Sequence, residues 1–313
     1  MKMKAAGILS VGKYLPSRIV TNKELEEIVD TSHEWIVSRT GIEERRIGNE
    51  RESTAYMAYK SAEEALQKAN LSPLDIDLII VATTTPNRKF PSVASMVQDK
   101  IGCIDAAAYD INAACSGFIF ALVNAQQFIE NSMYKHILVI GADKMSTVID
   151  WKDRNTCVLF GDGAGAVVLG PVSDGKGILS AELGTEGRSG YYLFEDTHIQ
   201  MNGREVFKFA VRTLGASAMR TVEKAKLRKD DIDMLIPHQA NIRIMESARE
   251  RLGVPPEKMS VTVDKYGNTS AASIPLSLYD ELEKEKIKDG DVLVLVGFGA
   301  GLTWGAATLR WGK

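Results

Sequence analysis

The sequence contains three cysteines, and the surroundings of one of them favour chemistry. Cys115 follows a strand-like segment and a link of small residues, and it opens a predicted helix at 116–129. The free N–H groups and positive end of a helix stabilise a thiolate, which is the nucleophilic form of cysteine. We therefore predict that Cys115 is a nucleophile, against the alternative of a buried cysteine at a tight turn. Cys103, at a helix-to-strand turn, and Cys157, in an apolar strand, are predicted to be inert core residues.

His238 is the candidate partner among the four histidines. It lies in the segment LIPHQAN, directly after a short buried strand, and α/β proteins place their chemistry at the carboxyl ends of strands. A structural histidine at a strand end is the alternative. The other three histidines are scattered among polar or strand-edge residues, and no pair has metal-ligand spacing, so we predict no metal site.

Asn268 lies in the segment KYGNTSAAS, where Gly267 permits a sharp turn. We expect Thr269 or Ser270 to cap the helix that follows. Taken alone, Asn268 is better explained as a turn residue than as a catalytic one. Two glycine-rich segments lie at 161–165 and 297–301. Neither segment matches the dinucleotide-binding pattern G-x-G-x-x-G or the P-loop pattern, but their backbone N–H groups are suited to stabilise an oxyanion.

An α/β fold is needed to position these residues. Helical periodicity at 54–70 and 116–129 alternates with short, continuously apolar runs at 77–82 and 136–141. Such runs are typical of strands buried on both faces. The alternation predicts a sheet with helices on both sides.

The chain also repeats itself at half its length. The tripeptide Asp-Ile-Asp at 75–77 recurs at 231–233, and the apolar run at 137–141 recurs at 293–297, both 156 positions later. Apolar strands resemble one another in composition, so chance similarity is the alternative. The shared offset favours two related α/β halves packed as one unit, which we place at 1–171 and 172–313.

Bulk composition excludes several classes of protein. The 313 residues suffice for a large core, and 38 basic against 41 acidic residues give a net charge of −3. This balance disfavours binding to nucleic acid over a broad surface. Three cysteines argue against a disulfide framework, no apolar run reaches membrane-spanning length, and the N-terminal stretch lacks the features of a signal peptide. We therefore expect a cytoplasmic protein that spans no membrane.

Four segments resemble, in order and spacing, the β-ketoacyl-acyl carrier protein synthase III family of condensing enzymes. They are DINAACSGF, LIPHQANIRI, KYGNTSAAS and GFGAGLTWG; TSHEWIVSRTGIEERRI and RNTCVLFGDGAGAVVLG match as well. The resemblance runs essentially from end to end. It implies an α/β, thiolase-like fold of five layers, α-β-α-β-α, built from two similar halves, and it implies a homodimer.

The resemblance also implies a reaction. An acyl-CoA primer would acylate Cys115; malonyl-acyl carrier protein would then lose CO₂, and its carbanion would attack the thioester. The product is a 3-oxoacyl-acyl carrier protein that initiates fatty acid biosynthesis. His238, in its neutral form, and Asn268 would stabilise the malonyl thioester oxygen, and the backbone N–H groups of Cys115 and Ala300 would form a second oxyanion hole. No cofactor is implied, because the CoA thioester is a substrate.

Substrate contacts are carried over by position. Residues matching the CoA-binding contacts of the family are Trp35, Arg39 and Arg154. Those matching the pantetheine channel are Gly203, Phe207, Ala240 and Asn241. Those matching the acyl pocket are Leu159, Phe298 and, reaching across a dimer, Phe90. Ordinary core packing is the alternative for the three aromatic residues Trp35, Phe90 and Phe207.

Acyl carrier protein is acidic, and four basic residues near the predicted tunnel mouth are candidates for docking it. They are Lys208, Arg243, Arg249 and Arg251. A solvated helix face is the alternative for the last two, and Glu250 interrupts the run.

Other functions remain open from the residues. A related thiolase-fold synthase of specialised metabolism is the nearest alternative, whereas 3-hydroxy-3-methylglutaryl-CoA synthase is disfavoured because no matching glutamate motif is present. A non-catalytic acyl-binding protein would be expected to lack the cysteine. A cysteine hydrolase would need a Cys–His pair oriented by a third group and would release a free acid.

Overall fold

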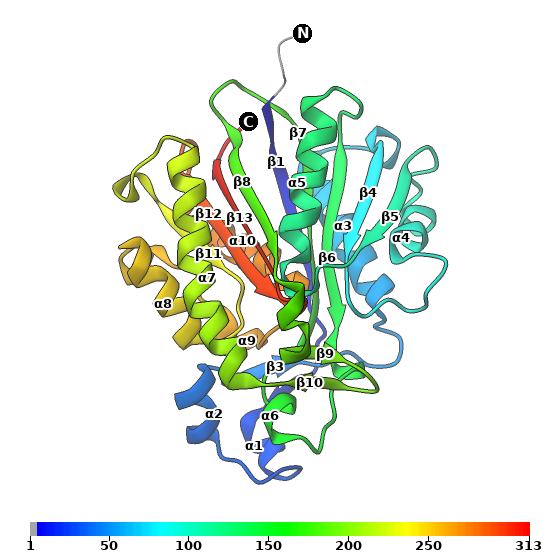
Figure 1. Ribbon diagram of the computed structural model, residues 1–313. Helices are drawn as coiled ribbons and strands as arrows, with labels where there is room; N and C mark the ends of the chain where they lie inside the picture. Colours follow the sequence, from blue (N-terminus) through cyan, green and yellow to red (C-terminus); the bar gives the residue numbers. More distant parts are fainter. Residues whose placement is uncertain (1–4) are drawn as a thin grey trace.

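The computed structural model describes residues 5–313, which form two large β-sheets with helices between and outside them (Figure 1), and two further two-stranded sheets, β2-β3 and β9-β10. The first sheet has the strand order β1-β7-β6-β4-β5, and the second has the order β11-β12-β13-β8. Strands of the first sheet are β1 (Ala5–Tyr14), β4 (Leu78–Ala82), β5 (Ala107–Ile111), β6 (Ile137–Lys144) and β7 (Asp162–Val172). Strands of the second are β8 (Gly177–Thr185), β11 (Met234–Pro237), β12 (Val292–Gly299) and β13 (Thr303–Arg310).

Helices occupy three layers around the two sheets. Two helices lie between the sheets: α5 (Gly117–Glu130) and α10 (Ser273–Glu283). The first sheet carries α3 (Thr54–Ala69) and α4 (Val93–Ile101) on its outer face. The second sheet carries α7 (Gly203–Lys224) and α8 (Ile242–Leu252). The resulting order α-β-α-β-α confirms the five-layered fold expected from the sequence.

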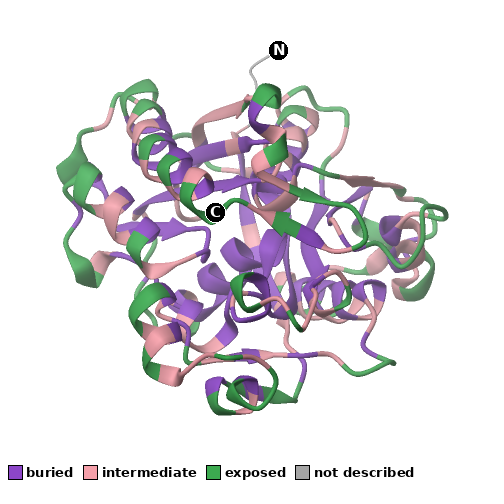
Figure 2. Cartoon of the chain, turned by 60° about the horizontal axis from the view of Figure 1, so that its bottom comes forward, coloured by how far each residue is buried: buried purple, intermediate pink, exposed green. Residues whose placement is uncertain are grey.

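Burial on both faces explains the continuously apolar strands. On β4, Leu78 and Ile80 pack into the core between the sheets, whereas Ile79 and Val81 pack against α3 and α4. Every residue of β4 and of β12 is buried, because each strand has helices on both sides. Figure 2 shows buried strands and helices in the interior of the molecule, with the exposed segments around them.

The second sheet repeats the order of four of the five strands of the first sheet, β1-β7-β6-β4, whereas β5 has no counterpart among its strands. The parallel pair β4–β6 aligns Leu78 with Ile137, and the parallel pair β11–β12 aligns Met234 with Leu293. Both partners are displaced by 156 positions, which is the offset found in the sequence. Non-glycine residues with positive φ repeat at the same offset: Asn70 and Lys226, and Ala114 and Ser270. These repeats support the division into two related halves, joined by the turn 173–176.

Shorter elements gather at one end of the sheets, where the central parallel strands terminate (Figure 1). They are β2 (Ile19–Thr21), α1 (Asn22–Glu26), α2 (His33–Thr40), β3 (Glu44–Arg46), α6 (Arg154–Cys157), β9 (Leu193–Glu195), β10 (Ile199–Met201) and α9 (Val263–Tyr266). The prediction of a strand at Cys157 is therefore wrong. Asp153 starts a helical turn there, because its side chain accepts a hydrogen bond from the backbone N–H of Asn155.

None of the helices described within residues 5–313 combines the length and apolar character needed to cross a membrane. Over the same residues, no group of three or more His, Cys, Asp or Glu side chains is arranged to hold a metal ion.

Candidate active site

A cavity of about 1250 Å³ lies where the two halves meet, at the carboxyl ends of the central strands. Eleven of the residues singled out in the sequence line it: Trp35, Cys115, Leu159, Gly203, Phe207, His238, Ala240, Asn241, Asn268, Phe298 and Ala300. The three candidate catalytic residues therefore share one cavity, although Cys115 belongs to the first half and the other two to the second.

Cys115 lies on a tight 3₁₀ turn, η2 (Ala114–Ser116), directly before α5. Ala114 has a φ of 49°, a left-handed conformation that an L-residue adopts at a cost of about 1–2 kcal/mol. The turn is held against the start of β13, because the Ser116 hydroxyl lies 2.9 Å from Thr303 Oγ1, and it also packs against the end of β12. A Cβ added to Gly299 would lie only 2.6 Å from the Cys115 nitrogen, so the close approach requires glycine.

The expectation of a stabilised thiolate at Cys115 is wrong for the free protein. Burial raises the pKa of the Cys115 thiol to about 12, and the nearby Ser270 side chain and the backbone N–H of Cys115 offset this only in part. The charge of Asp143 adds to the increase. Desolvation of the thiolate therefore outweighs the helix start, and the resting nucleophile is a neutral thiol that lines the cavity.

The internal repeat shows what is different about the backbone at Cys115. In the second half, the position equivalent to Cys115 is Ala271, whose backbone N–H donates to Asp143 Oδ2 at 3.1 Å. The position equivalent to Asp143 is Gly299, which has no side chain. The N–H of Ala271 thus donates to a carboxylate, whereas the N–H of Cys115 has no side chain opposite it at the equivalent position, where Gly299 packs closely.

His238 directly follows β11 and extends its pairing with β12, because its backbone N–H donates to the carbonyl of Val296 at 2.7 Å. The imidazole is buried against the ring of Phe298, 5.7 Å away between centroids. Burial lowers the pKa of His238 to about 3, so the ring is neutral, as the sequence analysis expected. Its Nδ1 lies 2.6 Å from the hydroxyl of Ser273.

Asn268 is fixed by a loop from the first half. Its backbone N–H donates to the carbonyl of Leu159 at 2.8 Å, and its carbonyl accepts from the N–H of Gly161 at 3.0 Å. The side-chain Oδ1 accepts from the backbone N–H of Ser270 at 2.8 Å. Because an N–H can only donate, this contact assigns Oδ1 and leaves the amide NH₂ as the donor available to the cavity.

The expected cap by Thr269 or Ser270 is wrong. Thr269 precedes and Ser270 begins a 3₁₀ turn, η7 (Ser270–Ala272), and the N-cap of α10 is Ala272, which makes no side-chain hydrogen bond. The Asn268 side chain instead accepts a hydrogen bond from the backbone N–H of Ser270.

Aromatic and basic residues surround the cavity rim. The guanidinium groups of Arg154 and Arg39 lie 5.0 and 5.6 Å from the ring centroid of Trp35. Asn241 caps α8 and donates from Nδ2 to the Arg39 carbonyl at 2.8 Å. The guanidinium of Arg243 lies 5.4 Å from the ring of Phe207. These contacts bring the predicted CoA residues into one group, which is suited to an aromatic ring carrying anionic substituents.

Other predicted residues lie apart from the cavity. Phe90 is 82% exposed, and Lys208 lies outside the cavity wall in an ion pair with Glu205 at 2.7 Å. Arg249 has only 15% of its side chain exposed and is bound internally to Glu246 and to the carbonyl of Val254. The side chain of Arg251 covers Gly215 and donates to the Arg212 carbonyl. Arg249 is therefore not presented as a free docking charge, whereas the Arg251 side chain is exposed and, among residues 5–313, makes only one hydrogen bond, at 3.3 Å.

Several cavity residues were missed by the sequence analysis. One group comes from the β9–β10 region and contains Tyr191, Leu193, Phe194, Ile199 and Met201. Strands of three residues show no periodicity that a sequence could reveal. Ser270 also lines the cavity, and Ser273 contacts the His238 ring from behind. Both lie inside the recognised segment KYGNTSAAS, where their spacing from Asn268 was the available signal.

The fold and cavity together define a class of protein. A cysteine, a histidine and an asparagine that meet between two duplicated α/β halves form the arrangement of thiolase-fold condensing enzymes.

Comparison with known proteins identifies the family. The family model described as 3-oxoacyl-[acyl-carrier-protein (ACP)] synthase III matches residues 109–187, and the C-terminal model of the same family matches 222–311. Proteins named β-ketoacyl-[acyl-carrier-protein] synthase III from Geobacillus kaustophilus and Bacillus anthracis are 61% and 59% identical over 308 and 307 residues. Each alignment covers 98% of this chain and 99% of the relative.

Solved structures agree with this result. The crystal structure of 3-oxoacyl-[acyl-carrier-protein] synthase III from Aquifex aeolicus is 49% identical, with a TM-score of 0.96 over 98% of this chain and all of that chain. A priming β-ketosynthase of the R1128 polyketide pathway is 35% identical, also with a TM-score of 0.96. The chain belongs to the 3-oxoacyl-acyl carrier protein synthase III family, and it is an acyltransferase of the condensing class.

Proposed function

We propose that this protein condenses an acyl-CoA primer with malonyl-acyl carrier protein to give a 3-oxoacyl-acyl carrier protein, CoA and CO₂, the step that initiates fatty acid biosynthesis. The observation that carries the proposal is the shared cavity, in which a thiol from one half meets an imidazole and an amide from the other.

Cys115 is the proposed acyl carrier. Its sulfur attacks the thioester carbonyl of the primer, the bond to the CoA sulfur breaks, and the thiol proton leaves with CoA as its new S–H. Negative charge develops on the carbonyl oxygen during this transfer. The backbone N–H groups of Cys115 and Ala300, two residues that line the cavity, supply the proposed oxyanion hole. Because the resting thiol is neutral, we propose that its ionisation is coupled to primer binding.

His238 and Asn268 are the proposed donors for decarboxylation. Loss of CO₂ from the malonyl group places negative charge on the thioester oxygen as the enolate forms. A neutral imidazole N–H and the free Asn268 amide stabilise this charge, each of them worth about 3–4 kcal/mol in comparable sites. The enolate carbon then attacks the acyl group on Cys115 and releases the cysteine sulfur as a thiolate, which takes up a proton from solvent to restore the neutral thiol.

The remaining cavity accommodates the carrier arm and the primer. We propose that Trp35, Arg39 and Arg154 hold the CoA nucleotide. The pantetheine channel is assigned to Gly203, Phe207, Ala240 and Asn241, and the acyl pocket to Leu159 and Phe298. For docking acidic acyl carrier protein we retain Lys208, Arg243 and the exposed Arg251, since internal contacts occupy Arg249.

A homodimer is proposed on two features of the surface. Strand β5 is the edge of the first sheet and has an apolar composition with partly exposed residues, so its backbone is open to pairing with a second copy. Phe90 lies in the loop before α4 with 82% of its surface exposed, which is unfavourable for a large apolar side chain. A second copy that covers both features would bring Phe90 toward the other cavity, as the family resemblance implies.

Substituting Phe90 tests the dimer. We expect Phe90→Asp to shift the protein toward monomers in light scattering coupled to size exclusion, because it places a charge in an apolar interface. Asp105→Asn, on the loop before β5, is the control for a charge change nearby. If Phe90→Asp forms dimers at the same protein concentrations as the wild type, the interface lies elsewhere.

The activity is tested with purified protein, malonyl-acyl carrier protein and a panel of straight and branched acyl-CoA primers. We expect a 3-oxoacyl product and stoichiometric CO₂ with at least one primer, and no acyl-enzyme in Cys115→Ala. Absence of a condensed product with every primer would refute the assignment. Release of free acid in place of condensation would indicate a hydrolase.

A further inference from the structure

Ser273 contacts the His238 ring and, unlike His238, does not line the cavity. It is the first residue of α10 and is buried. Its hydroxyl oxygen lies 2.6 Å from His238 Nδ1 and 3.4 Å from the backbone nitrogen of Gln239. Ser273 therefore occupies Nδ1 from outside the cavity lining, and Nε2 is the ring nitrogen left for a substrate.

The hydrogens in this contact can be counted. The backbone N–H of Gln239 can only donate, so the Ser273 oxygen acts as its acceptor. The serine hydroxyl carries one hydrogen of its own, and within residues 5–313 its remaining hydrogen-bond partner is His238 Nδ1. If Nδ1 also carried a hydrogen, the hydroxyl hydrogen would be buried without an acceptor, which proteins rarely tolerate.

We infer that Ser273 is a positioning residue that donates to His238 Nδ1 and thereby fixes the tautomer in which Nε2 carries the hydrogen. The ring then presents an N–H donor, and not a lone pair, on the edge opposite Ser273. This inference rests on the proposed function, in which His238 acts as a hydrogen-bond donor to the developing enolate. It assigns to Ser273 the task of making the imidazole a donor before any substrate is bound.

The tautomer is directly observable in the intact protein. Labelling with ¹⁵N-histidine gives signals from only four side chains, and those of His238 are identified by their loss in His238→Gln. We expect a protonated, pyrrole-type Nε2 and an unprotonated, pyridine-type Nδ1 at neutral pH. A pyrrole-type Nδ1 would overturn the inference, whatever the activity of the enzyme.

A variant tests whether Ser273 causes this state. We expect Ser273→Ala to weaken the preference for the Nε2–H tautomer and to slow decarboxylation of malonyl-acyl carrier protein by about 10- to 100-fold, less than the 10²–10³ for complete loss of an oxyanion donor. Acylation of Cys115 should keep its rate, since that step uses backbone donors. A wild-type tautomer or a wild-type decarboxylation rate in Ser273→Ala would contradict the role.

Ser277→Ala is the matched control. Ser277 lies one turn further along α10, is equally buried, and pairs with Thr262 Oγ1 at 2.8 Å, without contact to His238. Ser277→Ala removes a buried hydroxyl from the same helix as Ser273→Ala does, so a general packing defect would affect the two variants alike. We expect Ser277→Ala to keep the wild-type tautomer and decarboxylation rate; equal losses in both variants would overturn the assignment to Ser273.

Failure of the inference and failure of the proposed function give different results. If no primer yields a condensed product while His238 shows the Nε2–H tautomer, the function is refuted and the tautomer assignment stands. If condensation proceeds while Nδ1 carries the hydrogen, the function stands and the role of Ser273 is refuted.

Discussion

At the scale of single residues, desolvation dominates the two most reactive groups. Burial raises the pKa of the Cys115 thiol to about 12 and lowers that of the His238 imidazole to about 3. Both shifts favour the neutral form, because an ion loses its hydration in the cavity wall. The resting site is therefore uncharged at these two positions, and the helix start before α5 does not by itself produce a thiolate.

This conclusion predicts the pH dependence of alkylation at Cys115. Iodoacetamide reacts with the thiolate, whose fraction rises about tenfold per pH unit below the thiol pKa. We expect the rate to rise with this slope from pH 7 to 10 without a plateau, measured by intact-mass spectrometry. A plateau near pH 7 to 8 would show that the thiolate is already stabilised in the free protein.

Asn268 combines two roles that a pair of variants separates. Its Oδ1 holds the turn at Ser270, and its NH₂ is the proposed donor to the enolate. We expect Asn268→Ala and Asn268→Asp to acylate Cys115 normally but to decarboxylate about 10²–10³-fold more slowly, because both lack the donor. The measurement is CO₂ release from malonyl-acyl carrier protein after separate acylation. Normal decarboxylation in Asn268→Asp, which keeps the turn acceptor, would remove the amide from the mechanism.

At the scale of elements, the site depends on how closely the end of β12 approaches the turn η2. A methyl group on Gly299 would lie 2.6 Å from the Cys115 nitrogen and 3.0 Å from the Ala114 side chain. We expect Gly299→Ala to displace η2 and to slow acylation at least about tenfold, with a loss of roughly 1–3 kcal/mol of stability from overpacking. Acyl-enzyme formation by mass spectrometry and thermal unfolding measure the two effects.

Gly187→Ala is the control for that substitution. Gly187 begins the 3₁₀ turn η4 (Gly187–Tyr192) and has no neighbour within 4 Å of an added Cβ. It loses the same backbone freedom without a steric clash, so acylation should be unchanged. If both glycine variants lose acylation equally, the close contact at Gly299 is not the cause.

Elements buried on both faces could be predicted from the sequence, and elements that depend on long-range partners could not. The apolar run at 77–82 gave β4 because helices cover both of its faces. The segment around Cys157 is equally apolar, yet it begins with a helical turn because Asp153 caps it. The hairpin β9–β10 lines the cavity but consists of two three-residue strands, which leave no periodic pattern.

For the site, the sequence supplied the residues but not their electrostatics. The positions of Cys115, His238 and Asn268 follow from strand ends and the recognised segments, and all three reach one cavity. The raised pKa of Cys115 depends on burial by segments more than 100 positions away, such as the end of β12, and no local pattern records that. The contact between Ser273 and His238 likewise arises only when α10 packs beside β11.

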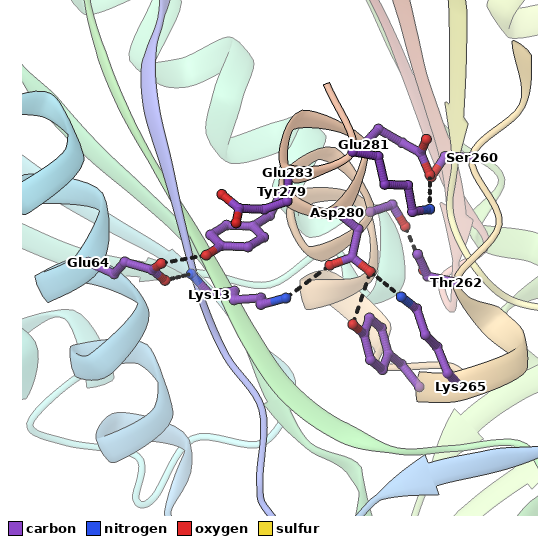
Figure 3. A network of polar contacts seen from close by, with 12 residues as sticks. Lys13, Glu64, Ser260, Thr262, Lys265, Tyr279, Asp280, Glu281 and Glu283 are labelled. Carbon is purple, nitrogen blue, oxygen red and sulfur yellow. Dashed lines mark hydrogen bonds and ion pairs between the residues drawn. The ribbon is translucent and has the colours of Figure 1, made fainter. Parts of the chain in front are cut away.

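At the scale of the whole molecule, α10 connects the two halves through a network of charges (Figure 3). Asp280 on α10 is 5% exposed and accepts from Lys13 of β1 at 3.0 Å, from Lys265 and from the hydroxyl of Tyr266 at 2.9 Å. Burial alone would raise the pKa of the Asp280 carboxyl, but Lys265 and Lys13 override it and hold the pKa below its usual value. The network thus stabilises the contact between the N-terminal strand and the C-terminal half.

Asp280→Asn should therefore destabilise the protein by roughly 2 kcal/mol at neutral pH, the scale of a hydrogen bond to a charged group. Because the folded pKa of Asp280 is lowered, its contribution is present above the unfolded value of about 4 and is lost as the pH falls through the folded value. Urea unfolding at several pH values measures this: the difference in the free energy of unfolding between the variant and the wild type should be constant from pH 8 to 5 and narrow below about pH 4.

Glu283→Gln is the control, since the exposed pair of Glu283 with Lys68 also joins the two halves but is worth at most about 1 kcal/mol. If both substitutions lower the free energy of unfolding equally, the buried ion pairs of Asp280 stabilise the contact between the two halves no more than an exposed pair does.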